Sequence, residues 1–366
     1  MKLLHPANLD PDRDWNEYDI ITAHLGWVRA MFQTTWHSSD RESDSFLGGY
    51  LEGQGLPVTP ETLATLRARM GLRPPNVVPE AGRIQRISPD SASPNTAGID
   101  CRASYSPVII HVPHAGLSWP DDGTPMPDVA DLAGEMTLMA DLFADQIAKQ
   151  VVQTMASRVM NHAAQARWPS LFINRLTRLA IDPERFDDNT EEMNCVGMGV
   201  VYERTHDKRP LYRDGLTLDD IGQRKALWYR PYAAALADLV DSTLAREGRC
   251  LIIDLHSYST DPLAYELHQT GERPPVCLGF EPQHDPGIDK AEQIFQDHGV
   301  ATARNTPFAG SYVPLKHWHK NPAVQSLMVE IRKDQYLDAN TPNTSKMDAL
   351  AAPIADFITA WMRQAT

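Results

Sequence analysis

Cysteine is scarce in this chain, with four residues in 366 and no CxxC pair. Thiols so few and so widely spaced indicate neither a disulfide framework nor a cysteine metal site. A chain of this length does not need disulfides to hold a core, so we expect a reduced, cytoplasmic protein. The four residues are Cys101, Cys195, Cys250 and Cys277.

Long apolar runs are also missing. The opening residues, MKLLHPANLDPDRDW, turn acidic and proline-bearing too soon to form the apolar core of a signal peptide. No stretch approaches the roughly 18–20 apolar residues of a membrane-spanning helix. We therefore expect no membrane partner.

Positive charge is in the minority. Lys and Arg number 34 against 48 Asp and Glu, which gives a net charge of −14. A surface of this sign repels phosphate backbones, so we expect no nucleic-acid partner, although a local basic pocket for a small anion is compatible with it. Apolar residues make up 42% of the chain and charged residues 22%, values typical of a globular protein with a sizeable core.

The chain is long enough for two domains, or for one domain with an extension. A stretch rich in Pro, Ser, Asn and Gly, residues 73–106, is typical of a linker or of an arm lying on the surface. Before it, a helix is predicted over 60–70, with Thr59 as its N-cap and Gly71 after its end. We therefore predict a mostly helical extension and linker over 1–95, of unassigned function, and a catalytic domain over 96–366.

The second part of the chain alternates between two patterns. Short apolar, β-branched runs predict buried strands, and long amphipathic stretches predict helices. Together they indicate an α/β sheet covered on both faces, in which ligands collect at the carboxyl ends of the strands. The predicted strands are 107–112, 170–174, 250–255, 275–280 and 325–331, and the predicted helices are 129–157, 219–246, 288–298 and 344–363.

Three predicted strands end in side chains that bind metals or move protons. One carries His111 and His114, the second carries Asp254 and His256, and the third carries Glu330 and Arg332. A single histidine at a strand end is usually structural, and a Glu-x-Arg pair is usually a salt bridge. Three such endings in one domain favour a functional site instead.

Zinc binds imidazole and carboxylate, and a catalytic zinc site needs three protein ligands. His114 and His256 supply two imidazoles. The helix predicted over 129–157 offers a carboxylate, because Asp141 and Asp145 lie four residues apart on one helix face. The alternative is that both aspartates are solvated.

A cluster of arginines lies in the segment NRLTRLAIDPERF, residues 174–186. The guanidinium fork matches a carboxylate, so these arginines are candidates for binding an anionic substrate. The alternative is an internal salt-bridge network with the acidic residues of the same segment. The cluster consists of Arg175, Arg178, Asp182, Glu184 and Arg185.

Eight short motifs occur in the order found in the N-formylglutamate amidohydrolase family, and the resemblance spans about 230 residues. They are HVPHAG (111–116), MADLFADQI (139–147), RLAIDPERF (178–186), EM through VGMGVVY (192–202), DLHS (254–257), CLG (277–279), PFAGSY (307–312) and EIRKD (330–334). The chain departs from the family pattern at Ala140 and Ala144, where threonine is usual, and at Ser311, where glycine is usual. Residues 1 to about 95 lie outside the resemblance.

The resemblance implies a three-layer α/β/α fold with a central mixed sheet, similar to zinc carboxypeptidases and aspartoacylases. It also implies hydrolysis of the amide bond of an N-acyl amino acid, such as N-formylglutamate. One divalent metal, Zn²⁺, and a small anionic substrate are then expected. Residues 1–95 are candidates for an oligomer contact.

Roles follow from combining the motifs with that chemistry. The expected metal ligands are His114, His256 and Asp141, with Asp145 as second choice for the carboxylate and His111 as a rival ligand. We expect the catalytic residues to be Glu330, as general base, with Arg178 and Arg332 holding the substrate carboxylate or the oxyanion. The expected substrate-binding residues are Arg185, Asp182, His111, Tyr312, His317 and His319.

Two rival hypotheses stay open from the sequence. The first is a peptidase, or a deacylase for other N-acyl amino acids, on the same scaffold. The second is a non-catalytic binding protein that kept the fold, against which the presence of His114, His256 and Glu330 argues.

Overall fold

The structure is a computed structural model. The chain divides into two units, Met1–Val77 and Val78–Thr366, and every described residue belongs to the second. The helix predicted over 60–70 lies outside the described residues, as does nearly all of the extension predicted over 1–95. The described residues are 86–87, 98–102, 104, 106–158, 167–267 and 271–364.

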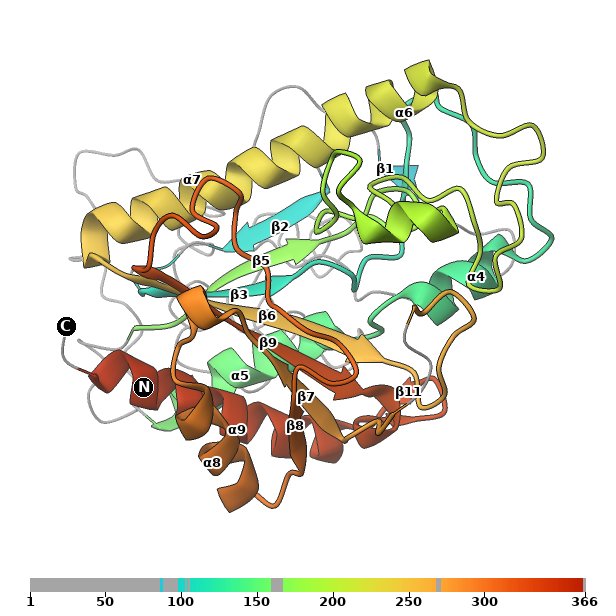
Figure 1. The fold of residues 1–366 in the computed structure, drawn as a ribbon. Helices are drawn as coiled ribbons and strands as arrows, with labels where there is room; N and C mark the ends of the chain where they lie inside the picture. Colours follow the sequence, from blue (N-terminus) through green and yellow to red (C-terminus); the bar gives the residue numbers. More distant parts are fainter. Residues whose placement is uncertain are drawn as a thin grey trace, which may run out of the picture. The chain divides into compact units, whose positions relative to one another are not determined.

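A seven-stranded sheet forms the centre of the second unit (Figure 1). The neighbours β5, β3, β6 and β9 run parallel, while β2 is antiparallel to β5 and β7 is antiparallel to β9. The predicted mixed sheet is therefore confirmed. In spatial order the strands are β2 (Ile99–Arg102), β5 (Ser170–Asn174), β3 (Val108–Val112), β6 (Cys250–Tyr258), β9 (Val324–Arg332), β7 (Val276–Gly279) and β8 (Thr302–Arg304).

Both faces of the sheet are buried because helices cover both. Along β3, Val108 and Ile110 pack into one apolar cluster, whereas Ile109 packs into another on the opposite face. All nine residues of β6 are buried. This double burial explains why the central strands appear in the sequence as continuous apolar runs.

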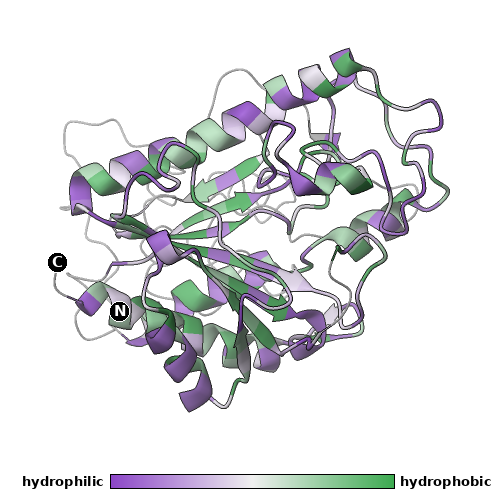
Figure 2. Cartoon of the chain, in the orientation of Figure 1, coloured by the Kyte–Doolittle hydropathy of each residue, from purple (hydrophilic) through white to green (hydrophobic). Residues whose placement is uncertain are grey.

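Helices lie in two layers, one on each side of the sheet (Figure 1). One layer contains α5 (Ala144–Arg158), α8 (Ile288–Asp297) and α9 (Thr344–Arg363). The other contains α7 (Arg230–Glu247), which continues α6 (Leu218–Arg224) through a π-helical turn at Lys225–Tyr229. Figure 2 shows apolar residues concentrated in the strands and along parts of these helices.

The helix predicted over 129–157 is wrong in one respect, because it is two helices. The first, α4 (Leu132–Met139), ends where Ala140 takes an extended conformation, and α5 begins only at Ala144. The backbone N–H of Asp141 donates instead to the carbonyl of His114, at 2.9 Å. A tertiary contact therefore replaces the helical hydrogen bond and places Asp141 in the break.

The prediction of a linker over 73–106 is also wrong for the last residues of that stretch. Ile99–Arg102 form β2, the edge strand of the sheet, because Ile99 is buried and Asp100 reaches Arg175 at 2.7 Å. Arg86–Ile87 form β1, which pairs with β4 (Trp119–Pro120) in a separate two-stranded ladder.

Shorter elements complete the described part of the chain. None of the helices formed by the described residues is long and apolar enough to cross a membrane. The 3₁₀ turns are η4 (Glu192–Val196), η6 (Pro282–His284) and η7 (Lys333–Gln335), and a small hairpin joins β10 (Leu337–Asp338) to β11 (Thr341–Pro342).

Candidate active site

Polar side chains collect at the carboxyl ends of β3, β6 and β9. In the register of the parallel strands, His111 lies beside Asp254, and His256 lies beside Glu330. These four residues occupy the face of the sheet that carries α7, since they follow the alternation of Ile109 and Ile252. The site therefore lies where open α/β sheets usually bind ligands.

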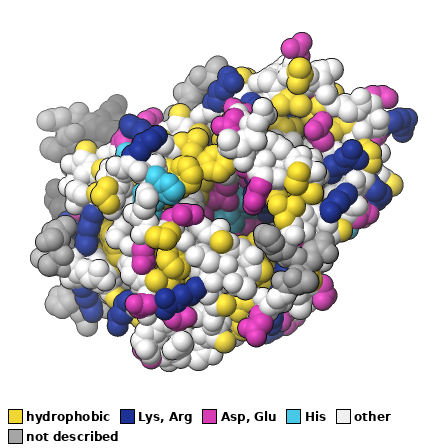
Figure 3. Space-filling model, viewed as in Figure 1, with side chains coloured by type: hydrophobic (Ala, Val, Ile, Leu, Met, Phe, Trp, Pro, Cys, Tyr) yellow, Lys and Arg dark blue, Asp and Glu magenta, His cyan; other side chains and the backbone are white. Residues whose placement is uncertain are grey.

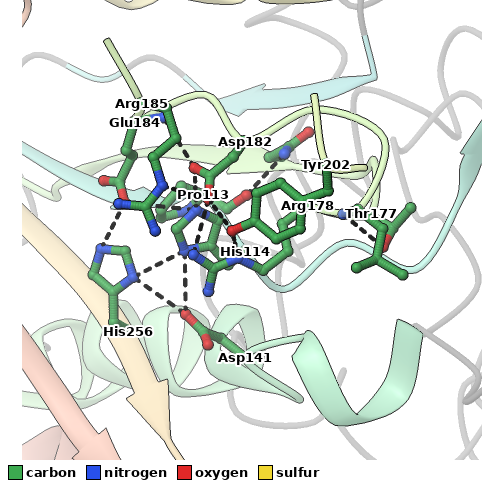
Figure 4. Close-up of polar contacts among 12 residues, drawn as sticks. Pro113, His114, Asp141, Thr177, Arg178, Asp182, Glu184, Arg185, Tyr202 and His256 are labelled. Atoms are coloured by element: carbon green, nitrogen blue, oxygen red, sulfur yellow. Dashed lines mark hydrogen bonds and ion pairs between the residues drawn. The ribbon is translucent and has the colours of Figure 1, made fainter. Parts of the chain in front are cut away.

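Three nitrogen and oxygen atoms form a compact triangle (Figure 4). The Nδ1 atoms of His114 and His256 lie 3.2 Å apart. The Oδ2 atom of Asp141 lies 3.2 Å from Nδ1 of His256 and 3.7 Å from Nδ1 of His114. All three side chains are buried, so water does not separate their charges. Two imidazoles and one carboxylate at such spacing are a set that can hold a divalent metal.

The second ring nitrogen of each histidine in the triangle, Nε2, faces a carboxylate. Nε2 of His114 lies 2.8 Å from Oδ1 of Asp182, and Nε2 of His256 lies 3.1 Å from Oδ1 of Asp254. Asp254 is itself fixed by the backbone N–H of Tyr312, which donates to its Oδ2 at 3.0 Å. Metal-binding histidines commonly donate their second N–H to a carboxylate in this way, which fixes the ring orientation.

Glu184 adds an arrangement that the sequence analysis did not select. Its Oε2 lies 3.3 Å from Nε2 of His256 and 3.6 Å from Nε2 of His114, which makes it a rival third ligand. We favour the triangle with Asp141 because both Nε2 atoms already face Asp182 and Asp254, whereas the two Nδ1 atoms face each other and Asp141. A second grouping, His111 with Glu184 and Asp254, also has ligand-like spacing.

The carboxylates of this cluster stabilise positive charge on the neighbouring histidines. Burial alone would lower the pKa of His256, but the charges of Glu184 and Asp254 outweigh it and raise that pKa well above its usual range. Burial would likewise raise the pKa of Asp141, but its hydrogen bonds with His114 and His256 hold it below its usual value. The same surplus of carboxylates attracts a divalent cation.

Glu330 lies buried in the same pocket. Its pKa is raised to about 7, chiefly by burial, while the charge of His256 opposes that shift and the charge of Asp141 adds to it. The Glu330–Arg332 salt bridge considered as an alternative is wrong, because Arg332 pairs with Asp334 at 2.7 Å. No described residue forms an ion pair with Glu330.

The arginine cluster divides between two places. Arg178 donates to Asp182 at 2.9 Å, and Nε of Arg185 lies 3.4 Å from the same carboxylate. Both arginines nevertheless line the pocket. Arg175 instead pairs with Asp100 and with Asp145, outside the pocket. Arg178 and Arg185 therefore form salt bridges within the segment, as the alternative proposed, and also line the pocket, where they could bind a substrate.

The remaining predicted residues are placed as follows. Asp145 pairs with Lys149 at 2.7 Å and lies outside the triangle. Nδ1 of His111 lies 2.9 Å from Asp254, and its Nε2 lies 2.6 Å from the hydroxyl of Tyr232. Among the predicted substrate-binding residues, Tyr312 and Arg185 line the pocket, whereas Asp182, His111, His317 and His319 do not. Arg332, which was predicted as a catalytic residue, does not line it either. His317 faces Asp241 and His319 stacks on Trp318.

A pocket of about 900 Å³ opens over these groups. Figure 3 shows the hollow in this face, with acidic and histidine side chains at its floor and hydrophobic side chains at its rim. Sequence reasoning missed most of its wall, since most of these residues lie in loops and short turns, which carry no periodic signal. The wall includes Phe186, Met193, Tyr229, Tyr265, Phe308 and Trp318, together with the cations Arg178, Arg185, Lys316 and Lys333.

The pocket lies at the strand ends of a three-layer α/β domain, where such folds usually bind small molecules. Residues 106–337 match the model of the N-formylglutamate amidohydrolase family. The chain therefore belongs to that family and is a hydrolase that acts on amide bonds.

Solved structures show the same fold. The N-formylglutamate amidohydrolase from Ralstonia eutropha JMP134 is 23% identical, with a TM-score of 0.57 over 72% of this chain and 99% of that one. A gene product of Agrobacterium tumefaciens is 14% identical, with a TM-score of 0.53 over 72% of this chain and 94% of that one. No curated protein matches the chain.

Proposed function

We propose that the protein hydrolyses the amide bond of N-formyl-L-glutamate or a closely similar N-acyl amino acid, and that it does so with one divalent metal, zinc. The observation that carries the metal is the triangle of His114, Asp141 and His256, with its donor atoms 3.2 to 3.7 Å apart. The family match supports the substrate.

The donor set fits zinc. Imidazole and carboxylate are its usual ligands in catalytic sites, and three protein ligands leave a position for water. Asp182 and Asp254 would orient the two histidines through Nε2. Bound there, the ion would supply Lewis acidity toward the amide carbonyl and lower the pKa of water.

Different residues of the chain would then transfer protons and bind the substrate. Glu330, with a pKa of about 7, is poised to take the proton of the attacking water and to return it to the leaving amine nitrogen. Arg178 and Arg185 line the pocket and would hold a substrate carboxylate. Tyr202 donates to Asp182 at 2.7 Å and Arg178 donates to Tyr202 at 3.1 Å, which keeps the arginine in place.

The test joins metal content to activity. We expect the purified protein to hold about one zinc per chain, to release formate and glutamate from N-formyl-L-glutamate, and to lose activity with a chelator until zinc is restored. His256→Ala should lose the metal while keeping its fold, because the scaffold forms the site. His298→Ala changes an exposed histidine that pairs with Asp356 and serves as the matched control. A metal-poor, inactive wild type, even after zinc reloading, would contradict the proposal.

A second candidate is favoured by the size of the pocket. A volume of about 900 Å³ lies within the range that holds drug-sized ligands, and formyl is the smallest acyl group. The family's N-acyl chemistry would then extend to longer acyl groups. Rates with N-formyl, N-acetyl and peptidyl glutamate on the same preparation decide between the two candidates.

A further inference from the structure

Among the described residues, four lysine and arginine side chains line the pocket, and three of them have a carboxylate partner within the protein. Arg178 and Arg185 share Asp182, and Lys316 pairs with Asp241. The fourth is Lys333. Among the described residues, no carboxylate lies within ion-pair distance of its ammonium.

Lys333 follows directly on the carboxyl end of β9, in η7, three residues after Glu330. Its Nζ donates to the backbone carbonyl of Leu138 at 2.9 Å. An ammonium has three N–H donors, so two are left for other partners. Lys333 lines the pocket together with the triangle residues and Glu330.

Leaving a half-buried cation without an ion-pair partner is unfavourable. Burial lowers the pKa of Lys333 to about 8, and the charges of Asp141 and Glu330 only partly offset the combined effect of burial and of Arg178. At neutral pH the group is still largely protonated. A carboxylate arriving with the substrate would restore the balance through a charge-assisted hydrogen bond.

We propose that Lys333 binds a second carboxylate of the substrate, distinct from the one held by Arg178 and Arg185. The two carboxylates of N-formyl-L-glutamate would then be bound at two separate cationic sites. This inference rests on the proposed function and assigns specificity within it. The metal-binding residues and the general base are the same for any N-acyl amino acid, and Lys333 selects the acidic ones.

A purely structural role has to be separated from this one. Leu138 lies in the last turn of α4, where a cation is favourable because helix C-termini carry partial negative charge. A residue that only capped α4 would affect folding stability and all substrates alike. A carboxylate-binding residue affects KM for only those substrates that carry its carboxylate.

The experiment crosses two enzymes with three substrates. Wild type and Lys333→Met are assayed on N-formyl-L-glutamate and on its two monoamides, N-formyl-L-glutamine and N-formyl-L-isoglutamine. We expect Lys333→Met to raise KM for N-formyl-L-glutamate by roughly 10- to 100-fold with little change in kcat. On the monoamide that lacks the carboxylate bound by Lys333, the same substitution should change KM by less than about threefold.

Two further variants complete the design. Lys333→Arg keeps the charge and should restore most of the affinity. Lys346→Met removes a lysine that pairs with Asp338 outside the pocket and should leave KM unchanged. Equal losses on all three substrates, or a fall in kcat at constant KM, would overturn the role of Lys333. If Lys333→Met does not fold, Lys333→Gln replaces it in the same comparison.

Calorimetric titration with L-glutamate, the product, separates failure of this inference from failure of the proposed function. A wild type that hydrolyses none of the three substrates refutes the proposed function. In that case, weaker glutamate binding by Lys333→Met than by Lys346→Met still supports carboxylate binding at Lys333. Equal binding by both variants, or no binding by the wild type, overturns it.

Discussion

At the scale of single residues, Glu330 separates chemistry from scaffolding because it lacks a salt-bridge partner in the described part of the chain. Glu330→Gln keeps the shape of the side chain but cannot accept a proton. General acid–base groups contribute roughly 10²- to 10⁴-fold, so we expect kcat to fall by about that factor. KM should change little because ground-state binding is untouched. Steady-state kinetics on N-formyl-L-glutamate measure both.

Metal content and melting temperature are measured on the same Glu330→Gln preparation. Both should match the wild type, because Glu330 is not among the proposed ligands. Loss of metal in this variant would instead make Glu330 a ligand. A loss of stability with kcat per folded molecule unchanged would make it structural.

The ionisation of Lys333 predicts how KM for N-formyl-L-glutamate depends on pH. Its pKa is about 8, lowered by burial and Arg178 against the charges of Asp141 and Glu330. The ammonium is present below that pH and is lost above it, so KM for N-formyl-L-glutamate should rise as pH increases beyond about 8. Lys333→Arg stays charged, and its KM should not show this rise. A KM that rises equally in both proteins would point to another group.

The site shows which residues a sequence can and cannot reveal. His114 and His256 were predictable because an imidazole interrupts or follows an apolar strand, and parallel strands bring their carboxyl ends together. Glu184 and Lys333 were not selected as site residues. Each lies in a charged segment, and sequence does not say which charged groups are already paired.

At the scale of elements, the strands and most helices were predictable because burial on both sheet faces leaves apolar runs of strand length. The prediction missed the break between α4 and α5. Residues 140–143 contain neither glycine nor proline, so the apolar period continues through them. The break depends on the hydrogen bond from Asp141 to His114, which joins segments far apart in sequence.

Asp145 pairs with Lys149 of the same helix at 2.7 Å and with Arg175, directly after β5, at 3.2 Å, so the second pair connects the start of α5 to the sheet. Breaking a buried ion pair costs about 3–5 kcal/mol, so Asp145→Asn should lower the free energy of unfolding by roughly that much at neutral pH. Asp289→Asn, at an exposed ion pair, should change it little. Urea unfolding of the three proteins measures the differences.

The pH dependence of that difference follows from the pKa of Asp145. Burial would raise this pKa, but the charges of Lys149 and Arg175 hold it below its usual value. A depressed folded-state pKa stabilises the fold above the unfolded pKa, near 4, and the gain is lost as pH falls through the folded-state value. The gap between wild type and Asp145→Asn should therefore be full above about pH 5 and shrink below pH 4. A constant gap across that window would contradict the pairing.

At the scale of the whole molecule, the layered sheet was predictable but its strand order was not. Local periodicity reports which residues are buried and does not report which strands are neighbours. The sheet places β6 between β3 and β9, although 137 residues separate the end of β3 at Val112 from the start of β6 at Cys250. That adjacency, rather than any one motif, brings His114 and His256 together.

The last prediction concerns where the folded enzyme begins. All described residues lie in Val78–Thr366, and we expect a chain starting at Val78 to fold, to bind metal and to keep the activity of the full chain. A chain starting at Pro94 also loses β1, whose two residues pair with β4, and the ion pair of Arg86 with Asp121. That ion pair is largely exposed, so it contributes about 1 kcal/mol or less. The Pro94 chain should therefore melt only a few degrees below the Val78 chain, with the same kcat. Insolubility of both chains would show that residues 1–77 are needed for folding. Insolubility of the Pro94 chain alone would place the boundary of the folded enzyme between residues 78 and 93.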